Sequence, residues 1–418
     1  MKCNEIKRYK IDKGRRTFLK KLSVMGAGIA VGGLPKLVHS QTKKEIVIGG
    51  IAPVSGFMAA VGQHEKNSFE MAFEEINAAG GIKSLGGAKI KALFGDDEGK
   101  PESGMAEAER LIRAGAVILI GCDLSHVTYA TTAIAEKYKV CHIVPMSVAD
   151  NITERGFKYT FRTTDRTAIQ GRRIMRFIKA LELRAGGNIK TGVIMYVDNL
   201  YGKSVADSVN NAAKETGVIK ILDVIPYPQN PRDLTSEITK AKTYKPDLLM
   251  PVSYVPDSIL ITNTMYEQRF DVMAVLGCSS LHATQDYMQG VGKKGNYVMS
   301  ATSMENLLSK KFQTYAKKYL SRYGKPTIAH GAVFYEAAYL SADVLERAAS
   351  TDSEKIRQAF RATNYFSDLV TREGTIYFDE TGQCPCNIRA LIQIFDGKYY
   401  VVDPPQFAQR EVVFPIPK

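Results

Sequence analysis

The chain has 418 residues, 45% of them apolar, and a formal net charge of +13. Residues 1–40 hold ten Lys or Arg against two Asp or Glu, a net +8, which leaves +5 for the remaining chain. Nucleic-acid-binding proteins gather Lys and Arg on one face, and no block of like charge follows residue 40, so the composition argues against a nucleic-acid partner.

The first forty residues have the three parts of an export signal. Arg15 and Arg16 end a basic stretch, an apolar run rich in Gly and Ala spans 22–34, and residues 38–40 form a small-residue cleavage pattern. This order resembles a twin-arginine signal peptide. The apolar run is shorter than the about 20 residues that a spanning helix needs. We therefore expect residues 1–40 to be removed after export, and the mature protein to work in the periplasm.

Five cysteines remain after the signal, and their pairing is open. An oxidising compartment permits a disulfide, but a sequence cannot assign one. Cys384 and Cys386 are separated by a single proline, a spacing that looks too tight for an easy local bridge, and no His or second Cys pair lies near enough for a metal site. We therefore interpret the cysteines as small buried side chains and a free thiol.

From residue 45 the sequence alternates short apolar strands with helices. The expected elements are strands at 46–49, 89–94, 116–121 and 140–144, and helices at 64–79, 103–114 and 125–138. In the last helix we expect Val127, Ile134 and Tyr138 to face inward. Strands that read as unbroken apolar runs between helices indicate a parallel sheet covered on both faces.

The same alternation restarts after Thr163. The expected helices are 166–184, 203–215, 234–242 and 257–269, a further one before residue 297, then 310–323, 328–348 and 353–362; the expected strands are 191–197, 219–225, 247–252, 272–276, 297–300, 375–378, 388–395 and 399–402. Asp396-Gly397 predicts a hairpin turn.

The roughly 380 residues after the signal exceed what one core supports, so we predict an α/β protein with two doubly wound lobes.

The loops after the strands are where an open α/β sheet binds ligands. Ser125 follows an apolar strand and looks like the N-cap of a helix, where free N–H groups and the positive helix end suit a carboxylate; a capping serine without a ligand is the alternative. Its neighbour His126 is a candidate for ligand contact. Asp96 and Asp97 predict a solvated strand end rather than a metal site or a catalytic pair.

Enzyme motifs fail when their context is considered. The glycines at 26–32 lie in the expected signal, Gly202-Lys203-Ser204 lacks the first glycine of a phosphate loop because that position is Val197, and Ser55-Gly56 lacks the nucleophile elbow. The mature histidines show no metal-ligand spacing. We therefore predict a protein that is not an enzyme and that carries no cofactor and no metal.

The motifs that remain carry a family resemblance. They are IGGIAPVSG at 48–56, FEEINAAGGI at 73–82, FGDDEGKP at 94–101, residues 120–125, IVPMSVADNITERG at 143–156, Phe161-Arg162, DNLYG at 198–202 and the ending 374–382 with 396–398. In this order they resemble the periplasmic branched-chain amino acid (Leu/Ile/Val) binding proteins of ABC transporters. The resemblance implies the type I periplasmic binding fold, two α/β lobes with a three-segment hinge that close on a ligand.

The resemblance also implies boundaries. Crossings between the lobes are expected near Thr164, Ala301 and Thr371. Lobe 1 would then comprise 44–164 and 302–370, and lobe 2 would comprise 165–301 and 371–418.

Ligand contacts follow from the same resemblance, position by position. Ser125 matches the serine that holds the ligand carboxylate, and Ser147 matches the small residue whose backbone meets the ligand. Tyr201 and Tyr254 match aromatic contacts from the second lobe. Where amino-acid receptors place an acid for the ligand ammonium, this chain has Ser279.

Two further departures make the ligand an open question. Val148 replaces a frequent hydroxyl, and Val61 stands where relatives are often aromatic and would widen the pocket. A buried ammonium without a partner costs several kcal/mol, so either Asp123 or Asp257 supplies the charge, or the ligand has no α-amino group. We therefore expect a small carboxylate, amino-acid-like or amide ligand.

These expectations favour a monomeric solute-binding subunit that passes a small molecule to membrane permease subunits. The alternatives are a periplasmic ligand sensor of the same fold that docks on a signalling partner and, third, an exported hydrolase.

Overall fold

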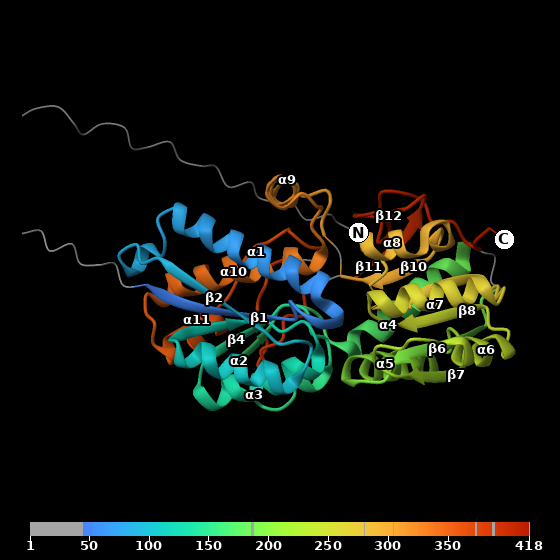
Figure 1. Ribbon diagram of the computed structural model, residues 1–418, viewed down its shortest axis with the longest axis horizontal. Helices are drawn as coiled ribbons and strands as arrows, with labels where there is room; N and C mark the ends of the chain where they lie inside the picture. Colours follow the sequence, from blue (N-terminus) through green and yellow to red (C-terminus); the bar gives the residue numbers. More distant parts are fainter. Residues whose placement is uncertain are drawn as a thin grey trace, which may run out of the picture. The chain divides into compact units, whose positions relative to one another are not determined.

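The computed structural model describes residues 45–184, 188–279, 281–303, 305–372, 374–386 and 389–417. The expected signal peptide, residues 1–40, lies outside these ranges. Within them the chain forms two β-sheets, each with its own helices (Figure 1).

The first sheet has five parallel strands in the order β2-β1-β3-β4-β5. Its strands are β1 (Ile46–Ala52), β2 (Ile90–Asp96), β3 (Ala116–Ile120), β4 (Cys141–Val144) and β5 (Thr160–Arg162). Its helices are α1 (Ala59–Ala78), α2 (Pro101–Arg113), α3 (Ser125–Tyr138), α9 (Lys310–Tyr323), α10 (Ala329–Ala348) and α11 (Ser353–Arg361). Side chains alternate along each strand, so Ile118 and Ile120 pack with residues of α1 and α10, whereas Leu119 packs with residues of α2 and α3.

The second sheet has seven strands in the order β12-β11-β10-β9-β8-β6-β7. Its strands are β6 (Thr191–Val197), β7 (Lys220–Tyr227), β8 (Leu248–Val252), β9 (Ala274–Cys278), β10 (Met299–Thr302), β11 (Ala390–Phe395) and β12 (Lys398–Asp403). Its helices are α4 (Thr167–Arg184), α5 (Leu200–Thr216), α6 (Thr235–Thr243), α7 (Val255–Glu267) and α8 (Gln285–Val291). Only the pairs β10–β11 and β11–β12 are antiparallel among the described strand pairs. Asp396 and Gly397 form the hairpin turn between the last two strands, both with positive φ, as predicted.

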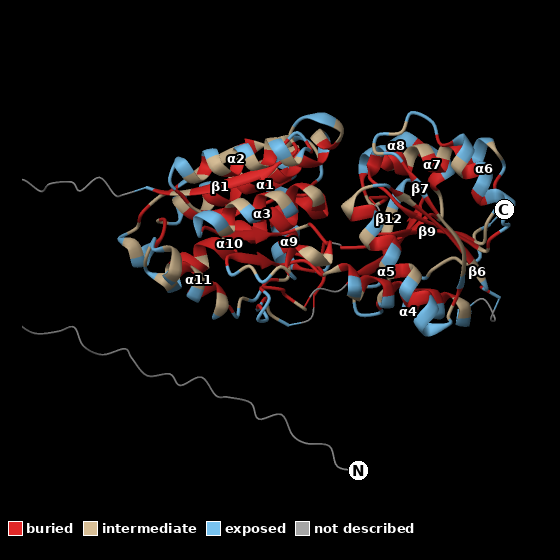
Figure 2. Ribbon diagram, turned by 90° about the horizontal axis from the view of Figure 1, so that it is seen from below, coloured by how far each residue is buried: buried red, intermediate tan, exposed pale blue. Residues whose placement is uncertain are grey.

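The inner strands of both sheets are buried, the edge strands β2, β7 and β12 are partly exposed, and the helices expose their outer faces (Figure 2). Burial on both sides explains why the strands read as continuous apolar runs in the sequence. Within the described residues, no helix has the length and apolar character needed to cross a bilayer.

The chain passes between the two sheets three times. The first passage joins β5 to α4, and the second joins β10 to α9. The third lies later than the expected position near Thr371, because Ile376, Phe378 and Cys384 still belong to the core of the first sheet. Cys386 also belongs to that core, whereas Ala390 begins β11 in the second sheet.

Three other expectations were wrong in detail. Residues 375–378 form no strand; Ile376 makes a single bridge to Tyr365. The three-residue strand β5 was not expected, since it is too short to show a pattern. Tyr138 is 36% exposed rather than inward, because it lies in the last turn of α3.

The cysteine interpretation also changes at one place. Cys384 and Cys386 are joined in a disulfide, although their spacing had suggested otherwise. Cys122, Cys141 and Cys278 are free and buried, as the sequence had indicated.

Candidate functional site

A small cavity of about 40 Å³ lies at the carboxyl ends of strands from both sheets. It is lined by Asp123, Leu124, Ser125, Met146, Ser147, Val148, Tyr201, Tyr254, Ser279, Leu281, Thr302, His330 and Arg389. These residues follow β3, β4, β6, β8 and β9, end β10, begin α10 or precede β11. Parallel strands present their carboxyl ends at one edge, which is why residues so distant in sequence meet here.

The start of α3 forms one wall of the cavity. Ser125 is the first residue of this helix, and Leu124 is the N-cap, so the expectation that Ser125 caps the helix was wrong. Its Oγ instead accepts a hydrogen bond from the backbone N–H of Ala149, at 3.4 Å. The first N–H groups of a helix lack partners within it and carry its positive end, so this wall suits an anionic group.

Ser147 directs its hydroxyl away from the cavity. Its Oγ lies 2.7 Å from the carbonyl oxygen of Asp123 and 2.5 Å from Oγ1 of Thr128. The Ser147 hydroxyl is therefore engaged within the protein, while Met146 and Val148 of the same loop line the cavity.

Two tyrosines form the opposite wall. The rings of Tyr201 and Tyr254 are 5.1 Å apart, and Tyr201 donates a hydrogen bond to the carbonyl oxygen of Ser279, at 2.7 Å. Asn199 donates to the hydroxyl of Tyr254, at 3.3 Å. Burial raises the pKa of both phenols, so both remain neutral.

Phe57, which lies beside the first sheet, packs edge-on against Tyr254 with ring centroids 5.4 Å apart.

Acidic and imidazole side chains meet on the wall formed by the first sheet. The carboxylate of Asp123 lies 3.5 Å from Nε2 of His330, the second residue of α10. Glu65 of α1 is fully buried near Asp123. Burial raises the pKa of Asp123 and lowers that of His330. Asp97, expected at a solvated strand end, is fully buried in the same region, and burial raises its pKa to about 7.

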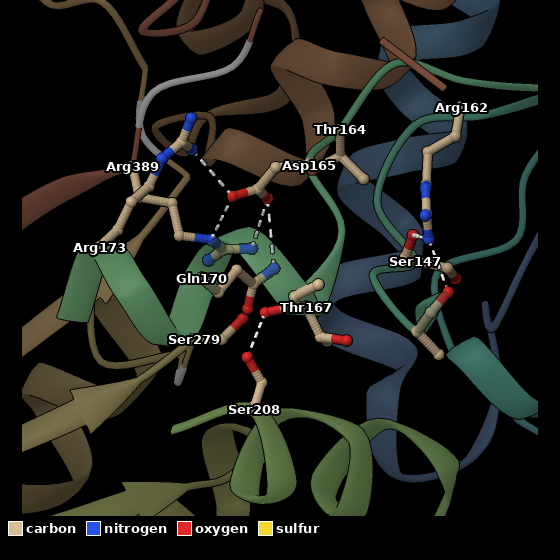
Figure 3. A network of polar contacts seen from close by, with 12 residues as sticks. Ser147, Arg162, Thr164, Asp165, Thr167, Gln170, Arg173, Ser208, Ser279 and Arg389 are labelled. Carbon is tan, nitrogen blue, oxygen red and sulfur yellow. Dashed lines mark hydrogen bonds and ion pairs between the residues drawn. The ribbon is translucent and has the colours of Figure 1, made fainter. Parts of the chain in front are cut away.

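Arg389 contributes a buried guanidinium. Asp165 accepts hydrogen bonds from its Nε and Nη2, at 3.1 and 3.0 Å, and from Arg173 Nη1, at 3.0 Å (Figure 3). The Asp165 side chain is fully buried, and that of Arg389 is 2% exposed. This ion pair joins the segment after β5 to the segment before β11, at two of the three passages between the sheets.

Two candidates from the sequence lie outside the cavity. His126 turns its Nε2 towards the carbonyl oxygen of Gly99, at 3.2 Å. Asp257 accepts hydrogen bonds from the hydroxyl of Tyr227 and the N–H of Tyr254, at 2.7 and 3.1 Å. Of the two acids considered for a ligand ammonium, only Asp123 lines the cavity.

The profile of the periplasmic binding protein family matches residues 45–394. This chain belongs to the periplasmic binding protein family. The Leu/Ile/Val-binding protein homolog 8 of Brucella abortus is 26% identical over 405 residues, covering 94% of this chain and 98% of that protein. Homolog 7 of Brucella suis is 26% identical over 381 residues, covering 89% and 94%.

Solved structures show the same type I fold. The leucine-binding protein of Thermotoga maritima has a TM-score of 0.75 at 21% identity, covering 86% of this chain and 99% of that one. A Streptococcus pneumoniae branched-chain amino acid binding protein, solved with isoleucine, has a TM-score of 0.74 at 22% identity, covering 89% and 100%. An ABC transporter solute-binding protein from R. palustris, solved with benzoate, has a TM-score of 0.73 at 18% identity, covering 86% of this chain and 95% of that one.

In this periplasmic binding protein the structure gathers Asp123, Ser125, Ser147, Tyr201, Tyr254 and Ser279 around one cavity. Sequence reasoning missed His330, Thr302 and Arg389. Thr302 is the last residue of β10, a strand that the sequence had predicted to end at residue 300. The rule that ligands bind at the carboxyl ends of strands could have identified it if the strand end had been predicted correctly. His330 and Arg389 follow no strand of the alternating pattern, so no rule about strand ends could have selected them.

Proposed function

We propose that this protein is the extracytoplasmic solute-binding component of an ABC importer. It captures a small carboxylate, amino-acid-like or amide ligand between its two α/β lobes and delivers it to membrane permease subunits. Export through the twin-arginine signal at residues 1–40 places it in the periplasm.

The observation that carries the proposal is the cavity, whose walls come from both sheets. A ligand that touches both walls binds more tightly when the two lobes are closed than when they are open. Such a ligand therefore shifts the equilibrium towards the closed arrangement. The membership of the family and the names of the Brucella relatives support transport rather than catalysis. Ser125 and His126 do not form a catalytic pair, since their side chains bond to different backbone groups.

The test begins with a thermal-shift screen of amino acids, aromatic acids and short amides. With the strongest stabiliser, we expect Ser125→Ala to weaken binding by about 1–3 kcal/mol in calorimetry, through loss of a hydrogen bond to a charged group. Ser353→Ala, which changes the first residue of α11, is the matched control and should leave the affinity unchanged. Unchanged affinity of Ser125→Ala would remove Ser125 from the site, and no stabiliser in any class would contradict the proposed function.

A further inference from the structure

Three polar side chains face the cavity from neighbouring strands of the second sheet. Arg389 directly precedes β11, Thr302 ends β10 and Ser279 follows β9, and all three line the cavity. The strand register brings them together, because Thr302 lies opposite Ala390, the residue after Arg389, and Ala301 lies opposite Cys278, the residue before Ser279.

Arg389 has hydrogen-bond donors that its protein partner does not use. A guanidinium holds its N–H groups in a planar fork that can serve acceptors on more than one edge. Asp165 accepts from Nε and Nη2, at 3.1 and 3.0 Å (Figure 3). Nη1 makes no hydrogen bond with a described residue, yet it is not among the polar atoms sealed without a partner. Although the side chain is only 2% exposed, its Nη1 edge is therefore open to the cavity.

Ser279 and Thr302 add two hydroxyl groups to the same wall. Neither hydroxyl bonds to a described residue, and neither is sealed without a partner. The backbone of Ser279 is fixed, because its N–H donates to the carbonyl oxygen of Ala301, at 2.9 Å, and its carbonyl oxygen accepts from Tyr201, at 2.7 Å. Buried donors without a partner are costly, so this wall is built to receive an acceptor.

The acids of the protein leave these donors available. Among the described residues that line the cavity, the acid is Asp123, whose ion-pair partner is His330 Nε2 at 3.5 Å and not Arg389. Asp165 is shared, since it also accepts a hydrogen bond from Arg173, at 3.0 Å. Charged hydrogen bonds between a guanidinium and a carboxylate are among the strongest in proteins, so an anionic acceptor suits the open edge of Arg389 best.

We infer that Arg389, together with Ser279 and Thr302, binds an anionic group of the solute, and that the solute is a short dicarboxylate. One carboxylate meets the start of α3 on the wall of the first sheet, and the other meets Arg389 on the wall of the second sheet. A solute with a negative group at each end thus contacts both walls. This inference rests on the proposed function and specifies its ligand class, with Arg389 as the specificity-determining residue.

The experiment compares ligands of equal shape on the whole mature protein. Malonate, succinate and glutarate are titrated by calorimetry, each beside its half-amide, in which an uncharged carboxamide replaces one carboxylate. The variants are Arg389→Gln, Ser279→Ala and Ser125→Ala. Arg172→Gln is the matched control, because its guanidinium is 70% exposed and pairs with Glu215 on the surface.

We expect a dicarboxylate to bind the wild type about 10-fold or more tightly than its half-amide, as for loss of a charged hydrogen bond. In Arg389→Gln this preference should disappear, and affinity for the dicarboxylate should fall on the order of 10- to 100-fold. Ser279→Ala should weaken it less, because it removes a neutral donor. Ser125→Ala should weaken both ligands by a similar factor, since Ser125 meets the other end. Arg172→Gln should bind like the wild type.

The folding of the Arg389 variants requires its own control, because Arg389 is also the partner of Asp165. Circular dichroism establishes that each variant is folded. Arg389→Lys keeps a positive charge towards Asp165 but lacks the planar fork, so it should also lose the preference for the dicarboxylate. The comparison of each dicarboxylate with its half-amide on the wild type depends on no variant.

Equal binding of a dicarboxylate and its half-amide by the wild type would overturn the inference, as would an unchanged preference in folded Arg389→Gln. Stabilisation by monocarboxylates, amino acids or amides alone in the thermal-shift screen would also overturn it, yet would leave the proposed function standing. Failure of every ligand class, dicarboxylates included, would remove both.

Discussion

Single residues decide the chemistry of this cavity, because the charged side chains in its wall are buried and each meets a specific neighbour. Asp165 holds Arg389 through two hydrogen bonds, and His330 Nε2 lies 3.5 Å from the carboxylate of Asp123. The network around Asp165 places one carboxylate against two guanidinium groups (Figure 3). Removing the carboxylate would leave a buried positive charge without compensation, which is the costly case for an internal ion pair.

Asp165→Asn should therefore lower the free energy of unfolding by about 3–5 kcal/mol, measured by urea denaturation. Asp207→Asn is the matched control, because its partner Lys203 and its own side chain are both more than half exposed; such pairs contribute about 1 kcal/mol or less. A similar small loss in both variants would show that Arg389 finds another partner when Asp165 is absent.

At the level of elements, the site depends on how closely the first turn of a helix approaches the end of the preceding strand. Asn199 caps α5 by accepting a hydrogen bond from Gly202 N–H, at 3.0 Å. A Cβ on Gly202 would overlap the carbonyl oxygen of Val197, the last residue of β6. Gly202, considered in the sequence as part of a failed phosphate loop, is thus required for close approach of α5 to β6, and this approach positions Tyr201.

We expect Gly202→Ala to destabilise the protein by about 1–3 kcal/mol through overpacking and to weaken ligand binding by displacing Tyr201. Thermal unfolding and calorimetry measure the two effects. Ser204→Ala, on the same helix and half-buried, should change stability by less than about 0.5 kcal/mol. If Gly202→Ala were as stable as the wild type, the start of α5 would be able to move away from β6 without a loss of stability.

At the level of the whole molecule, function requires contact between groups carried by the two sheets. Phe57 precedes α1, and Tyr254 caps α7, yet their rings touch beside the cavity. Such an aromatic pair contributes about 0.5–1.5 kcal/mol beyond its buried area. If a ligand favours the arrangement in which both walls meet, the energy of this pair adds to its affinity.

Phe57→Ala should therefore reduce ligand affinity by about 0.5–1.5 kcal/mol, mainly through faster dissociation, as followed by stopped-flow fluorescence or calorimetry. Phe366→Ala removes a phenyl ring that is 67% exposed, and it should leave binding unchanged. If Phe57→Ala and the wild type bound the ligand with equal affinity, the contact between Phe57 and Tyr254 would contribute nothing to ligand binding.

Periodicity and composition determined most of the fold. The helix 125–138, the strand 191–197 and the helix 310–323 have the predicted bounds, because buried strands and amphipathic helices leave strong local patterns. Loops after parallel strands likewise pointed to Ser125, Tyr201 and Tyr254, since topology places such loops at one edge.

Only the tertiary structure decided what the local pattern cannot encode. It buried Asp97, bonded Cys384 to Cys386, turned His126 away and brought His330 and Arg389 into the cavity. Each of these depends on residues more than twenty positions away or on the path of a loop without periodicity. The raised pKa of Asp123 likewise follows from its burial in the folded protein, which no local sequence pattern encodes.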